Sequence, residues 1–192
     1  MSIADQRPDG LAGPAASCRA VAGARRFAAD QTGATAVEFG IVAIPFIALM
    51  FAILETAIVF FAGQLLETAV GDTARLIRTG QAQEDGMSDT EFKTAVCSRM
   101  FSLIDCDGLT IDVRTIPTFD SAPLAVVLDE DGNVVVDDFA YQIGQAGDIV
   151  VVRVLYEWPV FVTALGNDLG TLGNGKHLLS ATSVFKNEPF PW

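Results

Sequence analysis

A run of apolar residues between Phe39 and Gly63 constrains this chain of 192 residues more than any other feature. Pro45 and Glu55 are its interruptions. A helix needs about 20 residues to cross a hydrocarbon core of about 30 Å, so the run is long enough. Residues 46–54 are apolar on all sides, which favours lipid surroundings over one face of a soluble core. We predict a membrane-spanning helix, with a helix buried in a soluble protein as the alternative.

The distribution of charge indicates an orientation for this helix. Residues 1–33 carry four arginines against three aspartates, net +1, which leaves −13 for the remainder of a chain whose total is −12. Basic residues that flank a span stay on the cytoplasmic side. We therefore predict a single-pass inner-membrane protein with a cytoplasmic N-terminus and a periplasmic C-terminal part beyond residue 64. The acidic balance argues against a nucleic-acid partner.

The pattern of elements predicts an α+β protein in three parts: a leader over 1–33, a long helix over 34–80 and a periplasmic α+β domain over 81–192. Beyond Gly63 the helix becomes amphipathic, with an apolar stripe at Leu66, Ala69, Val70, Ala74 and Ile77. Gly80 is placed to end it.

A second helix is predicted over 88–105, because Ser88 and Glu91 have the spacing of a capping box. Antiparallel strands are then expected, from β-branched or alternating runs, at 109–116, 148–156 and 178–185. A hairpin is expected at 124–136 around the acidic turn Asp129–Asn133.

Gly33 and Glu38 stand five residues apart just before the apolar run, with small residues between them. If the chain were cut after Gly33, the new amine of Ala34 would be positive and Glu38 negative. Isolated charges next to apolar surroundings are costly, and pairing these two would offset that cost. Taken alone, Glu38 also fits a boundary residue among lipid headgroups.

The sequence Gly33-Ala34-Thr35-Ala36-Val37-Glu38-Phe39 resembles the processing site of Tad (tight adherence) pilus proteins, the Flp pilin and the TadE-type minor pseudopilins. The chain has the TadE layout rather than that of the much shorter Flp pilin, and it lacks the large domain of TadG-type relatives. The resemblance covers residues 34–80 well and the remainder loosely, through the stretch 43–46, Glu55 and the terminal segment 184–190.

The resemblance implies that a prepilin peptidase cuts after Gly33 and that Glu38 and Phe39 supply the acid and the aromatic residue of the site. It implies a minor pseudopilin of Tad/Flp (type IVc) pili that acts in pilus assembly and surface adhesion. The implied partners are the prepilin peptidase, the Flp pilin, other minor pseudopilins and the inner-membrane assembly platform. No enzymatic activity, cofactor, metal or small-molecule substrate is implied.

Pro45 and Glu55 are candidates for contacts with a partner's helix in the membrane. Pro45 removes one helix hydrogen bond and is expected to kink the span. A carboxylate within a bilayer is costly and usually faces a partner. Glu55 follows Glu38 by about 25 Å along a helix, so it also fits a place near the outer interface.

Cys97 and Cys106 lie in the predicted periplasmic domain, where disulfides persist. On one straight helix their Cα atoms would be about 13 Å apart, and a bridge needs less than about 7 Å. Either the helix ends early and the chain turns back, or the two cysteines do not pair. The turn-like sequence at residues 105–108 favours pairing.

Two motifs are interpreted as coincidental. The glycine-rich segment 170–177 has P-loop spacing, but His177 stands where a Ser or Thr must hold magnesium and a strand is expected to follow. Gly132 comes too early after Asp129 for an EF-hand loop, which leaves a solvated turn or weak calcium binding. The alternative function for the chain is a single-pass, membrane-anchored periplasmic ligand-binding or adaptor protein with an uncut N-terminus.

Overall fold

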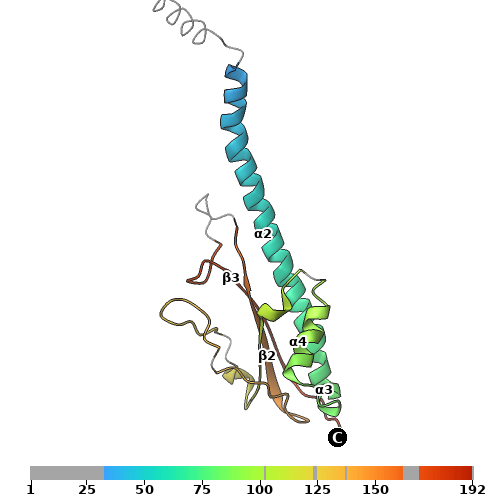
Figure 1. The fold of residues 1–192 in the computed structure, drawn as a ribbon. Helices are drawn as coiled ribbons and strands as arrows, with labels where there is room; N and C mark the ends of the chain where they lie inside the picture. The colour runs from blue at the N-terminus through green and yellow to red at the C-terminus, as the bar shows by residue number, and fades with distance from the viewer. Residues whose placement is uncertain (1–32, 102, 123–124, 137, 162–168, 192) are drawn as a thin grey trace, which may run out of the picture. The chain divides into compact units, whose positions relative to one another are not determined.

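The structure is a computed structural model that describes residues 33–101, 103–122, 125–136, 138–161 and 169–191. The contacts divide the chain after Ile47 into two units. The described elements are the helices α2 (Ala34–Arg78), α3 (Gln81–Glu84) and α4 (Asp89–Ser98), the single turns η1 (Cys106–Gly108) and η2 (Phe119–Ser121), and the strands β1 (Leu109–Ile116), β2 (Ile149–Trp158) and β3 (His177–Lys186) (Figure 1). The predicted α+β class is confirmed.

Helix α2 confirms the long helix predicted over 34–80 and continues on both sides of Pro45. In the second unit one stripe of α2 is buried, and it recurs at every turn of the helix: Ala52, Glu55, Val59, Ala62, Leu66, Ala69, Val70, Thr73, Ala74 and Ile77. The predicted stripe begins beyond Gly63, whereas the observed one begins at Ala52. The stripe is not predicted in the turns between Ala52 and Gly63, because the exposed side of the helix is apolar there too and the sequence shows no apolar–polar periodicity.

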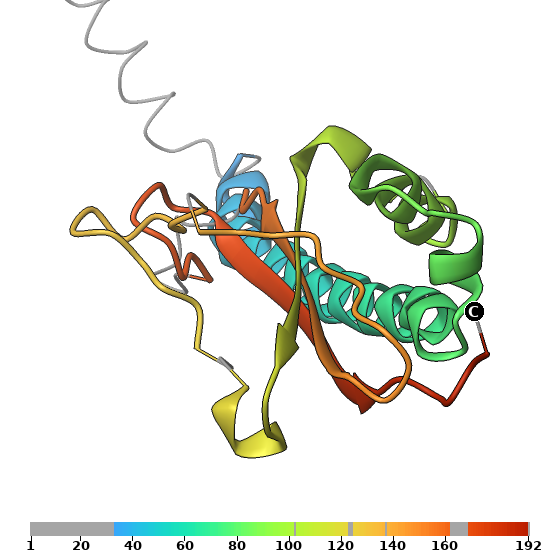
Figure 2. The same ribbon diagram turned by 90° about the horizontal axis from the view of Figure 1, so that it is seen from below.

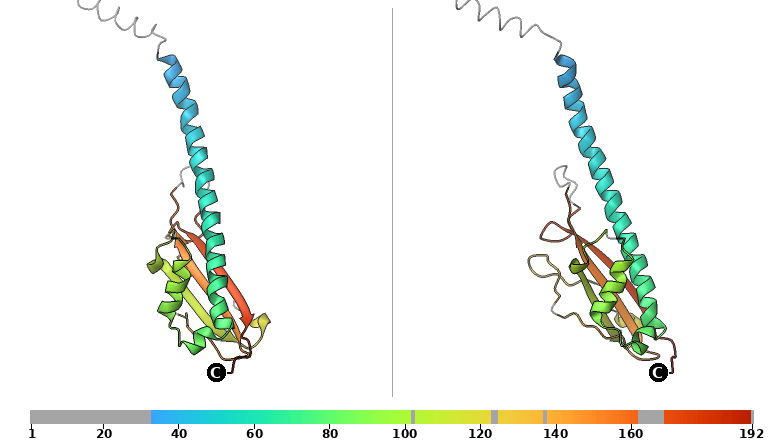
Figure 3. Two further views of the ribbon diagram at one scale, coloured as in Figure 1. Left: turned by 90° about the vertical axis from the view of Figure 1, so that its right-hand side faces the viewer. Right: turned by 45° about the vertical axis from the view of Figure 1, so that its right-hand side comes forward.

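The three strands form one antiparallel sheet in the order β1-β2-β3, with Leu109 opposite Tyr156 and Ile149 opposite Lys186. Figure 2 shows the sheet lying against α2, with α4 beside that helix. Both views of Figure 3 show β2 and β3 running alongside the C-terminal part of α2. The strands predicted at 109–116, 148–156 and 178–185 are therefore confirmed, each within two residues at either end.

The hairpin predicted over 124–136 is present in its described part as a short one: Leu128 and Val134 form an antiparallel bridge, and the N–H groups of Asp129 and Val135 donate to the carbonyls of Asn133 and Val127 at 2.9 and 3.0 Å. The Asp129 carboxylate accepts the backbone N–H groups of Asp131 and Asn133 at 3.0 and 2.7 Å. The Asp129 side chain thus holds the turn, and the antiparallel pairing beside it is a single bridge, shorter than predicted.

The second helix is shorter than predicted, Asp89–Ser98 instead of 88–105. Its capping box is confirmed: the Ser88 hydroxyl accepts the Glu91 N–H, and Glu91 accepts the Ser88 N–H at 2.8 Å. The helix ends because the chain turns at Phe101, whose φ is +49°. The turn lets both Met100 and Ile104 reach the core, where each is buried. The four-residue helix α3 was not predicted because it is too short to show a period.

The main core lies between α2, α4 and one face of the sheet. Val150, Val152 and Val154 of β2 point into it, together with Leu66 and Ile77 of α2. Val151, Arg153 and Leu155, which face the other side, are buried as well. Both faces of β2 are therefore covered, and this explains why its sequence is an almost continuous apolar run.

A buried ion pair occupies that other face of the sheet. Asp112 and Arg153 are opposite each other in the register and their side chains lie 2.9 Å apart. Arg153 also donates to the carbonyl of Ala125 at 2.8 Å, and Asp112 accepts the N–H of Ala140 at 3.2 Å. The pair thus attaches the segment between β1 and β2 to the sheet.

The C-terminal tail closes the C-terminal end of α2. The N–H of Glu188 donates to the carbonyl of Arg78 at 2.9 Å. The buried Asn187 amide donates to the carbonyls of Ile143 and Gln145. Gly80 ends the helix with φ +82°, as predicted, and Phe190 packs on it so closely that a Cβ there would lie 2.6 Å from the ring. Only glycine fits, because both the conformation and the space exclude a side chain.

We expect Gly80→Ala to lower the free energy of unfolding by more than about 2 kcal/mol, since it adds backbone strain to a clash with Phe190. Gly86→Ala is the matched control: its φ is +62° but its Cβ would meet open space, so only the strain of about 1–2 kcal/mol applies. Denaturant unfolding of the two variants checks this. Equal losses would contradict the packing of Phe190 on Gly80.

We expect Asp112→Asn to cost about 3–5 kcal/mol, because it leaves the Arg153 charge buried without its counter-ion. The exposed Asp107→Asn should stay within about 0.5 kcal/mol. A double variant, Asp112→Leu with Arg153→Leu, should recover part of the loss. Unfolding curves measure all three, and a harmless Asp112→Asn would show that the pair does not hold the sheet face.

Candidate functional site

The predicted processing site lies at the start of α2, in the first unit. Gly33 is in a turn and Ala34 is the first helical residue. The carbonyl of Gly33 accepts the N–H of Val37 at 3.1 Å, so the Gly33–Ala34 peptide bond belongs to the first helical turn. A Cβ on Gly33 would meet nothing within 4 Å, and residues 34–39 are all exposed. A protease that unwinds one turn could reach this bond.

Glu38 and Phe39 follow on the same exposed helix, and 73% of the Phe39 surface is accessible. Within the described residues the Glu38 side chain makes no hydrogen bond or ion pair. Its carboxylate is therefore available to a charge from outside this part of the chain or to the amine that cleavage would create at Ala34. The latter pairing cannot form while Ala34 remains in a peptide bond.

Exposed large apolar side chains cover α2 from its first turns onward. They are Val37, Phe39, Ile41, Val42, Ile44, Phe46 and Ile47 in the first unit, and Leu49, Met50, Phe51, Ile53, Leu54, Ile58, Phe60 and Phe61 in the second. The helix is long and apolar enough to cross a membrane. Water is a poor medium for so extended an apolar surface, which points to lipid or to other apolar helices as its surroundings.

Glu55 differs from the rest of this surface because it is buried, with 8% of its area accessible. Its carboxylate accepts the backbone N–H of Phe161, a residue just beyond the end of β2. The structure thus gives Glu55 a partner in its own chain. Contacts of Glu55 and Pro45 with another protein's helix stay a prediction. Sequence reasoning could not find the Phe161 amide, since every residue has one and 106 positions separate the pair.

Cys97 and Cys106 form a disulfide, with their Cα atoms 5.7 Å apart. The expected separation on a straight helix does not arise, because α4 ends at Ser98 and the chain turns back. The bridge closes the loop that carries Met100 and Ile104 into the core. The disulfide therefore has a structural role, because it joins α4 to the segment just before β1.

Among the described residues, three ionisable groups have displaced pKa values. Hydrogen bonds from Ser88 lower the pKa of Glu91. The pKa of Asp129 is lowered by the hydrogen bonds that its carboxylate accepts, of which that from the Asn133 N–H has the largest effect. Burial, with smaller contributions from the Asp89 and Glu91 charges, raises the pKa of Tyr141 to about 12. Each cause is local to a cap, a turn or a core. In the described residues no group of three His, Cys, Asp or Glu side chains is placed to hold a metal.

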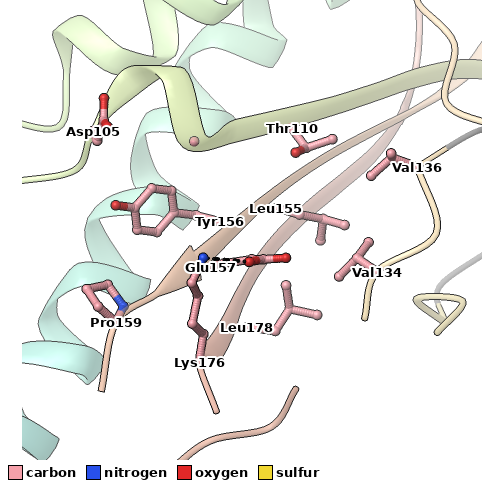
Figure 4. A pocket seen from close by; sticks show the side chains of 11 residues that line it. Asp105, Thr110, Val134, Val136, Leu155, Tyr156, Glu157, Pro159, Lys176 and Leu178 are labelled. Carbon is pink, nitrogen blue, oxygen red and sulfur yellow. Dashed lines mark hydrogen bonds and ion pairs between the residues drawn. The ribbon is translucent and has the colours of Figure 1, made fainter. Parts of the chain in front are cut away.

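A cavity of about 320 Å³ opens beside the end of β2 (Figure 4). Its lining includes the ion pair of Glu157 and Lys176, 3.0 Å apart, and the apolar side chains of Leu155 and Leu178. No nucleophile beside a base is present among its lining residues.

The glycine-rich segment 170–177 is not arranged as a phosphate loop in its described form. Lys176 is paired with Glu157, and the strand β3 begins at His177 where a P-loop would start a helix. The His177 ring nitrogen Nδ1 lies 2.6 Å from the carbonyl oxygen of Leu169, so the histidine has a structural contact. This agrees with the interpretation of the motif as coincidental.

Comparison with known proteins gives one result. Residues 33–75 match the family model described as "TadE-like protein". A search of curated proteins found no match, and neither did a search of solved structures. The matched segment begins at Gly33 and contains Glu38, the apolar surface and most of α2. The sheet and α4 lie outside it.

Proposed function

We propose that the chain is a minor pseudopilin of a Tad/Flp (type IVc) pilus assembly system, because residues 33–75 match the model of the TadE-like family. The family is one of pilus-assembly proteins that are not known as enzymes. The observation that carries the proposal is the family match itself, which starts at the glycine of the candidate processing site.

Prepilin peptidase removes residues 1–33 in this proposal, and the mature chain begins at Ala34. The open space around Gly33 and the exposure of the following turn support it, because a protease at the membrane surface needs an unhindered bond. The new Ala34 amine then pairs with Glu38, in the same subunit or a neighbouring one. That pairing offsets the cost of bringing each charge into apolar surroundings.

The mature protein is held in the inner membrane by α2, with its sheet domain in the periplasm. The exposed apolar surface of α2 packs against the helices of the Flp pilin and of other minor pseudopilins. The domain contacts the same partners or the inner-membrane assembly platform. Its role is to support pilus assembly and hence surface adhesion.

The first test determines the N-terminus of the membrane-fraction protein by mass spectrometry, in hosts with and without the prepilin peptidase. We expect a start at Ala34 that depends on the peptidase. Gly33→Val should abolish cleavage because a branched side chain blocks the site. Gly40→Ala is the matched control, since Gly40 is also surrounded by open space, and it should be processed normally. An intact N-terminus in both hosts would leave the anchored ligand-binding or adaptor protein as the better function.

The second test separates processing from assembly. We expect Glu38→Ala to be cut at Ala34 but to reduce piliation and surface attachment to the level of a peptidase-deficient host, because the mature amine loses its counter-charge. Glu67→Ala removes another exposed acid of α2 and should leave piliation unchanged. Pili counted by electron microscopy check both variants, and normal piliation in Glu38→Ala would contradict the pairing.

A further inference from the structure

The surface of α2 around Glu55 is apolar in both directions along the helix. Leu49 and Phe61, six residues before and after Glu55, are both exposed, as are Ile53 and Ile58 between them. Six residues of helix rise about 9 Å, so Glu55 lies about 9 Å inside either limit of this stretch. Whatever surrounds these apolar side chains, lipid or water, therefore also surrounds the helix at the position of Glu55.

The polar groups at this level are satisfied within the protein. Glu55 accepts the N–H of Phe161, and the Thr56 hydroxyl donates to the carbonyl of Ala52 at 2.9 Å. In water a carboxylate and an amide N–H can each hydrogen-bond to solvent. In hydrocarbon, either group costs free energy when it has no hydrogen-bond partner. The contact between Glu55 and Phe161 is the arrangement expected of two polar groups that share a dry environment.

The Phe161 side chain points outward although its backbone is held at Glu55, and 79% of its surface is exposed. Pro159, two positions earlier, is also exposed and has no N–H that would require a partner. An exposed aromatic residue beside an apolar helix has the character of a group that inserts among lipid chains.

From these contacts we propose that the segment Pro159–Phe161, at the end of β2, enters the bilayer beside α2, with Phe161 among phospholipid acyl chains. Glu55 is the positioning residue that holds the segment at this depth. The domain is then docked on the membrane instead of merely tethered to it, which fixes its height and tilt relative to neighbouring subunits. This inference rests on the membrane placement of α2 that is part of the proposed function.

The experiment uses the full chain in phosphatidylcholine vesicles whose acyl chains are brominated, with unbrominated vesicles as reference. Bromine quenches tryptophan emission only at short range. Tryptophan is placed at Phe161, at Phe51 of α2 as the membrane standard, and at Phe119 of η2 as the aqueous standard. Phe51 and Phe119 are both exposed, and the emission of the unsubstituted chain is subtracted.

Phe119 is a matched control because it follows Ile116, which pairs with Ile149 at the opposite end of β2 from Trp158. Nine residues of strand separate these ends by about 30 Å. We expect Phe161→Trp to lose emission as strongly as Phe51→Trp, and Phe119→Trp to lose little. If Phe161→Trp behaves like Phe119→Trp while Phe51→Trp is quenched, the inference is wrong and the membrane helix stands. If Phe51→Trp is not quenched, the membrane placement and the inference both fail.

The role of Glu55 is tested in the Phe161→Trp background. Glu55→Gln keeps a carbonyl oxygen that can accept the Phe161 N–H, so the quenching should persist. Glu55→Leu removes the acceptor, and the quenching should fall toward that of Phe119→Trp. Unchanged quenching in Glu55→Leu would overturn the assignment of Glu55 as the positioning residue.

Discussion

The domain depends on the packing of one stripe of α2 against the sheet. Ala62, Leu66 and Ile77 are fully buried in it and meet the inward-facing valines of β2. The apolar face of a sheet is stable when it is buried against another element, and α2 supplies that element here. The helix that carries the candidate processing site and the apolar surface is thus also the largest contributor to the core of the domain.

This double use of α2 explains the position of Glu55. The buried stripe reaches back to Ala52, into turns whose opposite side carries Ile53, Ile58 and other exposed apolar residues. A domain that packs so far along an apolar helix brings its own backbone to the level of that surface. The amide of Phe161 then requires an acceptor, and Glu55 supplies it. What looks in the sequence like a costly acid in a membrane span becomes one half of an internal pair.

The rest of the domain is closed by polar contacts that join distant segments. Asp112 and Arg153 attach the long connection between β1 and β2, and Asn187 attaches the C-terminal tail. Arg153, in the middle of a β-branched run, was the one available sequence signal for the buried pair, because a lone charge in a strand covered on both faces requires a counter-ion. Asp112, in an alternating strand, resembled an ordinary solvent-facing residue.

The sequence by itself determined the long helix, the three strands, the cap at Ser88 and the resemblance to TadE-like proteins at residues 33–39. These features are local, since periodicity, capping and a short motif act over a few neighbouring residues. The tertiary structure alone decided the partner of Glu55 and the burial of the pair Asp112 and Arg153. Both result from contacts between segments far apart in the chain, for which hydrophobic periodicity carries no signal.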